Sequence, residues 1–91
     1  MAAEIRVKAK SEAEYEVTVR EGVGETRHVV TAEPAYIRQL AGENGNGEEL
    51  LRRSFEFLLE RESKESILRR FHLREIGRYF PEYEKTIRRA G

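Results

Sequence analysis

The chain has 91 residues and no cysteine, and its 17 basic residues balance its 17 acidic ones, so the formal net charge is zero at pH 7. This length predicts one domain, residues 1–91, and the lack of cysteine excludes disulfides and thiolate zinc sites. The balanced charge indicates neither an anionic nor a cationic partner.

The first third of the chain alternates apolar and polar residues, as half-buried β-strands do. Ile5 and Val7 share one side of EIRVKA, and the apolar side of EYEVTVRE begins at Tyr15. The glycines of GVGE predict a turn, after which TRHVVTA returns as a further strand. We therefore expect two or three antiparallel strands within residues 4–32, and whether residues 1–10 pair with the others stays open.

The register of the hairpin around GVGE depends on the length of its loop. A loop of two or four residues places His28 and Val30 on the apolar face of the preceding strand, whereas a three-residue loop favours Val29. The three-residue loop would also set Glu21 opposite Glu25, and like charges directly opposite each other are unfavourable. We therefore expect Val30 to face the core.

The helical pattern begins after these strands. Pro34 suits the first position of a helix over residues 34–41, because its missing N–H is not needed there. After the glycine-rich loop GENGNGEE, Asn46 is placed to cap a helix over residues 47–62 that carries a wide apolar stripe. Phe57 lies off this stripe, so it either finds another neighbour or stays partly exposed.

The C-terminal third reads as a series of short helices. Their expected ranges are 64–71, 73–80 and 81–90. The helical spacing breaks between Phe71 and Ile76, which are five residues apart, and Pro81 restarts or kinks the helix. Gly77 interrupts a helix, which we attribute to close approach of a neighbouring element or to a kink; room for the backbone of a partner is the alternative.

Strands followed by helices predict an α+β fold, in which a two- or three-stranded antiparallel meander packs against three to four helices. The predicted core consists of the apolar positions that recur at strand or helix spacing. They are Ile5, Val7, Tyr15, Val17, Val19, Val30, Ile37, Leu40, Leu51, Phe55, Leu58, Leu59, Leu68, Phe71, Ile76 and Phe80.

An arginine-rich segment over residues 65–80 raises the question of nucleic-acid binding. Its arginines are Arg69, Arg70, Arg74 and Arg78. In a helix-turn-helix, Arg74 and Arg78 would lie on one face of the second helix. The turn lacks the usual glycine, however, and Glu65 and Glu75 are placed to pair with the arginines at near-neighbour spacing. We therefore favour a solvated helix face and keep nucleic-acid contact as the alternative.

The sequence gives little support for catalysis or for metal binding. His28 and His72 are the only imidazoles, and they do not stand at metal-ligand spacing. We expect no catalytic residue, no metal and no cofactor, and a small enzyme with a Glu/His site is the second alternative. The chain carries no apolar run of membrane-spanning length and no signal-peptide core in MAAEIRVKAK, so we expect a cytoplasmic protein without a membrane partner.

The leading functional expectation is a non-enzymatic protein-interaction or accessory module. Its partner would be another protein or a second copy of the chain, since a dimer would add to a small core. The expected partner surface is Phe57, which lies off its helix stripe, a sheet edge, or the aromatic end of the chain with Tyr83.

The stretch SFEFLLERESKESILRRFHLREIGRYFPEYE resembles a small uncharacterised bacterial protein family, a domain of unknown function with a C-terminal FLLERE…ILRRF…YFPEYE signature. The resemblance implies a strand-rich start, a helix ending in the FLLERE-like run, and YFPEY as a structural signature. In that signature Pro81 fixes a helix start, around which Tyr79, Phe80 and Tyr83 pack. The resemblance implies no activity, ligand or catalytic residue.

Overall fold

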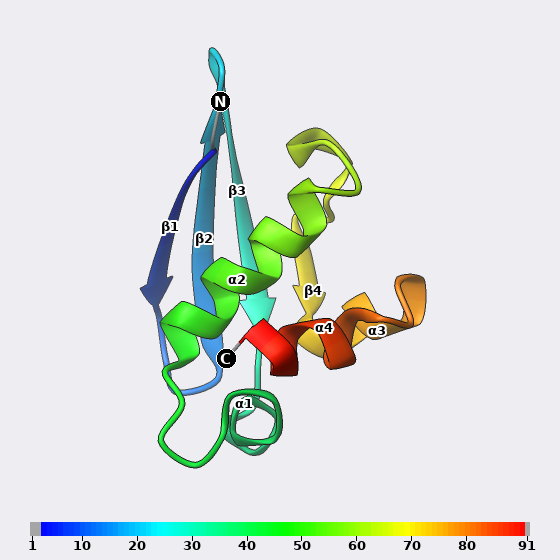
Figure 1. Ribbon diagram of the computed structural model, residues 1–91. Helices are drawn as coiled ribbons and strands as arrows, with labels where there is room; N and C mark the ends of the chain where they lie inside the picture. The colour runs from blue at the N-terminus through cyan, green and yellow to red at the C-terminus, as the bar shows by residue number, and fades with distance from the viewer. Residues whose placement is uncertain (1–2, 91) are drawn as a thin grey trace.

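The computed structural model describes residues 3–90 and the side chains of residues 3–88. It shows an α+β fold in which a four-stranded mixed sheet, in the order β1-β2-β3-β4, packs against four α-helices (Figure 1). The elements are β1 (Glu4–Ala9), β2 (Glu14–Glu21), β3 (Gly24–Thr31), α1 (Pro34–Ala41), α2 (Gly47–Leu59), the 3-10 helix η1 (Lys64–Ser66), β4 (Arg70–His72), the 3-10 helix η2 (Leu73–Glu75), α3 (Ile76–Tyr79) and α4 (Tyr83–Ala90). The predicted fold class is confirmed.

Strands β1, β2 and β3 form the antiparallel meander. Of residues 1–10, whose pairing the sequence leaves open, Glu4–Ala9 join the sheet as β1, and residues 1 and 2 lie outside the described residues. Glu21 pairs with Gly24, which leaves a two-residue turn in which Gly22 has a φ of 69°. This turn places His28 and Val30 inside the protein, both with no exposed surface. The predicted register is therefore confirmed.

The fourth strand corrects the helix expected over residues 64–71. Only η1 is helical there, and β4 then runs parallel to β3, with the N–H of Val29 donating to the carbonyl oxygen of Arg69 at 2.8 Å. Phe71 and Leu73 point inward while the residues between and before them are exposed. This short period-two pattern fits the free edge of β3, which supplies the hydrogen bonds that a strand needs.

The remaining helix boundaries differ by a few residues from those expected. The segment predicted as a helix over 73–80 begins as η2 and continues as α3, and α2 ends at Leu59. Helix α4 begins at Tyr83 because Pro81 lies in a turn, which the N–H of Tyr83 closes onto the carbonyl oxygen of Phe80 at 2.9 Å. The close approach expected at Gly77 is wrong, since a Cβ added there would meet nothing within 4 Å.

Helix α2 crosses one face of the sheet (Figure 1). Among the described residues it supplies more of the buried apolar side chains than any other element, namely Leu50, Leu51, Phe55, Phe57 and Leu58. Its first residue, Gly47, lies so close to the ring of Tyr15 that an added Cβ would overlap the tyrosine hydroxyl. The cap at Asn46 is formed, with its Oδ1 accepting from the N–H of Glu49 at 3.0 Å. No helix among residues 3–90 is both long enough and apolar enough to cross a bilayer.

The core contains most of the predicted residues and several others. Leu68 is wrong, because its side chain is 51% exposed, and three predicted positions are only half-buried: Val7, Leu59 and Phe80. Residues outside the prediction that are buried include Ala32, Tyr36, Leu50, Phe57, Ile67, Leu73, Tyr83 and Ile87. Most of these belong to α1, α4 and the segment around β4, where local spacing did not reveal which side would be covered.

Candidate functional site

The four arginines of the predicted nucleic-acid element do not share one helix face. Arg69 precedes β4 and Arg70 begins it, whereas Arg74 lies in η2 and Arg78 in α3. Two of them have acidic partners at the surface. The Arg70 guanidinium lies 3.5 Å from the Glu14 carboxylate, and that of Arg74 lies 3.5 Å from the carboxylate of Glu33. The four arginines are therefore not arranged as they would be on the second helix of a helix-turn-helix.

The two residues expected as a partner surface are buried. Phe57 is 4% exposed, and its ring packs edge-on against Tyr83 and Phe80, with centroids 5.2 and 5.8 Å apart. Tyr83 has no exposed surface, and its hydroxyl lies 2.6 Å from that of Ser54. Burial raises the pKa of the Tyr83 hydroxyl, against the effect of the bond to Ser54. The neighbours that Phe57 lacks within α2 come from the chain after α3, so this expectation is wrong.

The YFPEY segment also packs only in part as the resemblance implies. Tyr83 is buried and Phe80 half-buried, but the side chain of Tyr79 is 68% exposed. Tyr79 lies at the end of α3, and its side chain belongs to the surface beside that helix rather than to the core.

That surface is a groove with a volume of about 240 Å³ between the end of α2 and the elements that flank β4. We call it the β4 groove. Its floor and walls are mainly apolar, with two glutamates and a serine among them. The lining residues are Leu58, Glu62, Ser66, Ile67, Leu68, Phe71, Glu75, Ile76, Tyr79 and Phe80.

The position of Leu68 at this groove follows from a contact made by a buried histidine. The Nδ1 of His28 lies 2.8 Å from the carbonyl oxygen of Leu68, and its Nε2 lies 2.9 Å from the hydroxyl of Thr26. Because a carbonyl can only accept, Nδ1 donates and the neutral ring accepts from Thr26 through Nε2. The Leu68 backbone is thus held toward the core while its side chain remains on the surface.

The β4 groove has acidic residues in its lining, and arginines stand next to two of its lining residues in the sequence. Among the described residues that line it, Glu62 and Glu75 are the charged ones, and the Glu75 carboxylate also accepts from the N–H of His72 at 3.2 Å. Arg69 adjoins Leu68 and Arg78 adjoins Tyr79 in the sequence. Within residues 3–88, neither arginine forms an ion pair with an acidic side chain.

His28 is not placed to act as an acid or base on a substrate. Its ring has no exposed surface, and both nitrogens have structural partners. The ring lies tilted against that of Phe55, with centroids 5.2 Å apart. Burial lowers the pKa of His28, the bond to Leu68 opposes this, and the nearby charge of Arg69 lowers the pKa further. Among the described residues, no three or more metal-ligating side chains gather as a metal ion would require.

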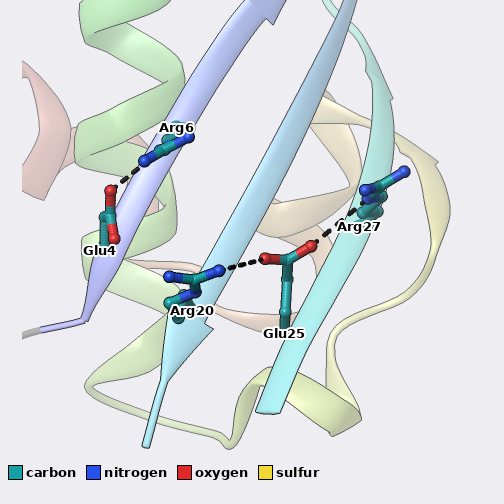
Figure 2. A network of polar contacts seen from close by, with 5 residues as sticks. All are labelled: Glu4, Arg6, Arg20, Glu25 and Arg27. Atoms are coloured by element: carbon teal, nitrogen blue, oxygen red, sulfur yellow. Dashed lines mark hydrogen bonds and ion pairs between the residues drawn. The ribbon is translucent and has the colours of Figure 1, made fainter. Parts of the chain in front are cut away.

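A second hollow, of about 190 Å³, lies on the sheet face opposite the core. Figure 2 shows its charged residues, in which Glu25 lies between Arg20 and Arg27 at 3.4 and 3.6 Å and Glu4 accepts from Arg6 at 2.9 Å. Each of these guanidinium groups already has a carboxylate partner. This hollow therefore offers less unmatched charge and less apolar surface than the β4 groove.

Sequence reasoning did not find the β4 groove. It placed Leu68 in the core, expected Tyr79 to pack around Pro81 and gave no role to Glu62. One signal was present: the break in helical spacing after Phe71, together with the alternation in RFHL, marks a segment that is not a helix.

Comparisons of the chain with protein-family models, with curated proteins and with solved structures find no match.

Proposed function

We propose that the chain is a protein-interaction module, and that the β4 groove receives apolar side chains from its partner. One observation carries the proposal. Three large apolar side chains are exposed among the described residues, namely Val23, Leu68 and Tyr79, and the last two border this one groove. Exposed apolar surface gathered at one place, with polar residues at its rim, is typical of protein-binding sites.

The size of the groove favours side chains over a free small molecule. Its volume of about 240 Å³ is below the range of roughly 300–1,000 Å³ that is usual for ligand pockets. A cavity of about 150 Å³ accepts a benzene-sized group, so this groove fits one or two bulky apolar side chains. Tyrosine is also among the residue types that contribute most at protein interfaces, which gives the exposed Tyr79 a role.

The acidic lining indicates the charge of the partner segment. Glu62 and Glu75 would attract a Lys or Arg that flanks the inserted apolar side chain, and complementary charge of this kind steers association. The preferred partner segment is therefore apolar and basic.

The experiment is a titration of isotope-labelled protein with two short peptides that carry leucines at helical spacing. One peptide has lysine on its other positions and the second has glutamate. We expect the lysine peptide to shift the backbone amides around Leu68, Ile76 and Tyr79, and the shifts to persist at moderate salt because the contact is largely apolar. The glutamate peptide should produce much smaller shifts.

Two variants control the titration. Leu68→Ser should weaken binding of the lysine peptide. Val23→Ser also removes an exposed apolar side chain, at the hairpin turn, and should leave binding unchanged. Absence of groove shifts with both peptides at millimolar concentration would refute the proposal. Salt-sensitive shifts with short mixed DNA or RNA, confined to the residues around the four arginines, would replace it by nucleic-acid binding.

A further inference from the structure

We propose that the partner in the β4 groove is a second copy of this chain, bound in a two-fold symmetric dimer. The inference rests on the proposed function and names its partner. It follows from the position of the exposed apolar side chains and of the arginines beside them.

First, the chain itself contains segments of the kind that the groove is proposed to bind. A suitable segment presents a bulky apolar side chain next to a cation. Leu68 is followed by Arg69, and Tyr79 is preceded by Arg78. Both apolar side chains lie exposed at the groove rim, so one patch holds both the groove and the side chains that could fill a copy of it.

The second step is symmetry. In a two-fold interface the same patch is used by both partners, so whatever residue i gives to residue j is returned by the other copy. A patch that is complementary to itself meets this condition. Tyr79 or Leu68 of each copy would enter the groove of the other, and both side chains would lose their contact with water.

The third step is the charge balance of the patch. Two acids, Glu62 and Glu75, lie in its lining, and Arg69 and Arg78 stand next to the lining residues Leu68 and Tyr79 in the sequence. Glu75 precedes α3 and Arg78 lies near its end. If the two α3 segments run antiparallel across the axis, each Glu75 meets the Arg78 of the other copy. Within residues 3–88 of one chain, Glu75 and Arg78 do not form an ion pair with each other.

The strand edges are less suitable for a dimer. The N–H of His72, at the end of β4, is already bonded to the Glu75 carboxylate, and β4 is only three residues long. The outer edge of β1 carries Arg6 and Lys8, and exposed charges of this kind are typical of edges that do not pair with other chains. The contact is therefore expected through side chains at the groove.

The test is sedimentation equilibrium from micromolar to millimolar concentration. We expect reversible dimerisation of the wild-type chain. Tyr79→Ser, Leu68→Ser and Arg78→Glu should each raise the dissociation constant at least about tenfold, since each removes a contact made twice or places like charges together. These side chains are exposed, so circular dichroism should show an unchanged fold.

Two variants serve as matched controls: Val23→Ser for the apolar changes and Arg52→Glu for the charge reversal. Both replace exposed side chains that do not line the groove, and both should leave the dissociation constant unchanged. A wild-type dimer that is insensitive to the groove variants, or that is weakened equally by the controls, would overturn the inference.

A chain that stays monomeric at millimolar concentration would also overturn it. In that case the lysine peptide separates the two proposals. If the peptide binds the groove of the monomer, the groove still serves a protein partner and only the second copy is excluded. If neither dimer nor peptide binding is found, both proposals fail.

Discussion

The β2–β3 hairpin and the segment over residues 63–82 adjoin each other in the fold, but different interactions hold them. The two hairpin strands pair over eight residues each, through a continuous backbone ladder. The later segment contains two 3-10 helices, a three-residue strand and a four-residue helix. It is held in place by the hairpin, through the bond from His28 to Leu68 and through Lys64, whose buried side chain lies against Gly24. The hairpin is thus held by its own backbone ladder, whereas the segment over residues 63–82 depends on contacts with the hairpin.

Replacing His28 is the strongest way to break this dependence. His28→Ala should lower the free energy of unfolding by about 3–5 kcal/mol, because it removes a buried ring and leaves the Leu68 carbonyl without its donor. His28→Gln, which retains an amide donor, should lose less. Urea unfolding measures both effects.

The exposed histidine provides the control for that series. His72→Ala should change the free energy of unfolding by less than about 0.5 kcal/mol, as is usual for surface positions. Hydrogen exchange adds the regional test: in His28→Gln the amides of residues 67–73 should exchange faster while those of β2 stay protected. Equal loss of protection in both regions would show that the later segment does not depend on the hairpin in this way.

Substitutions at two glycines should have the next largest effects on the free energy of unfolding. Gly47→Ala should cost about 1–3 kcal/mol, because the added methyl group overlaps the ring of Tyr15 and forces it to move. Gly77→Ala has open space around it and should instead stabilise the chain by about 0.5–1 kcal/mol through helix propensity. Thermal unfolding of the two variants measures the difference, and a stabilising Gly47→Ala would contradict the packing described for α2.

The pH dependence of stability tests the buried state of His28. Its pKa is lowered in the folded protein, so between the folded value and the unfolded value near 6.5 the unfolded chain binds more protons. Stability should therefore be complete above about pH 7 and fall as the pH drops below about 6.5. His28→Gln should flatten the profile in this range. The lowered pKa values of Glu65 and Glu82 act at lower pH, below the ordinary carboxyl value of 4.5.

The smallest effect is expected on the outer face of the sheet. Glu25→Gln removes the carboxylate shared by Arg20 and Arg27, but these side chains are exposed and the pairs are screened. The free energy of unfolding should fall by less than about 1 kcal/mol, and the difference should vanish at high salt. A larger, salt-independent loss would mean that this network, too, holds the hairpin together.

The same contrast explains which features could be predicted from the sequence. The meander, the inward position of Val30 and the Asn46 cap depend on residues close together in the chain, so alternation and capping patterns identified them. Strand β4 could not be found in that way, because its pairing partner is β3 and its three residues are too few for a clear pattern. Leu68 was placed in the core since its spacing to Phe71 suits a helix, but His28 turns it outward.

The candidate site was the least predictable part for the same reason. Phe57 was expected at the surface because nothing in α2 covers it, yet the chain after α3 does. Tyr79 was expected to pack around Pro81, but its side chain is 68% exposed. The surroundings of Phe57 are supplied by a distant segment, which no local pattern describes.

The parallel pairing of β3 with β4 has a consequence for the synthesis of the chain. Leu68 follows His28 by 40 residues. At ribosomal rates of about 5–20 residues per second, the edge of β3 and the ring of His28 wait roughly 2–8 s for their partner to be made. During that interval the nascent meander has an unpaired edge available to other chains. Binding by a chaperone in those seconds, or a pause in translation after α2, would therefore affect the yield of folded protein more than its final stability.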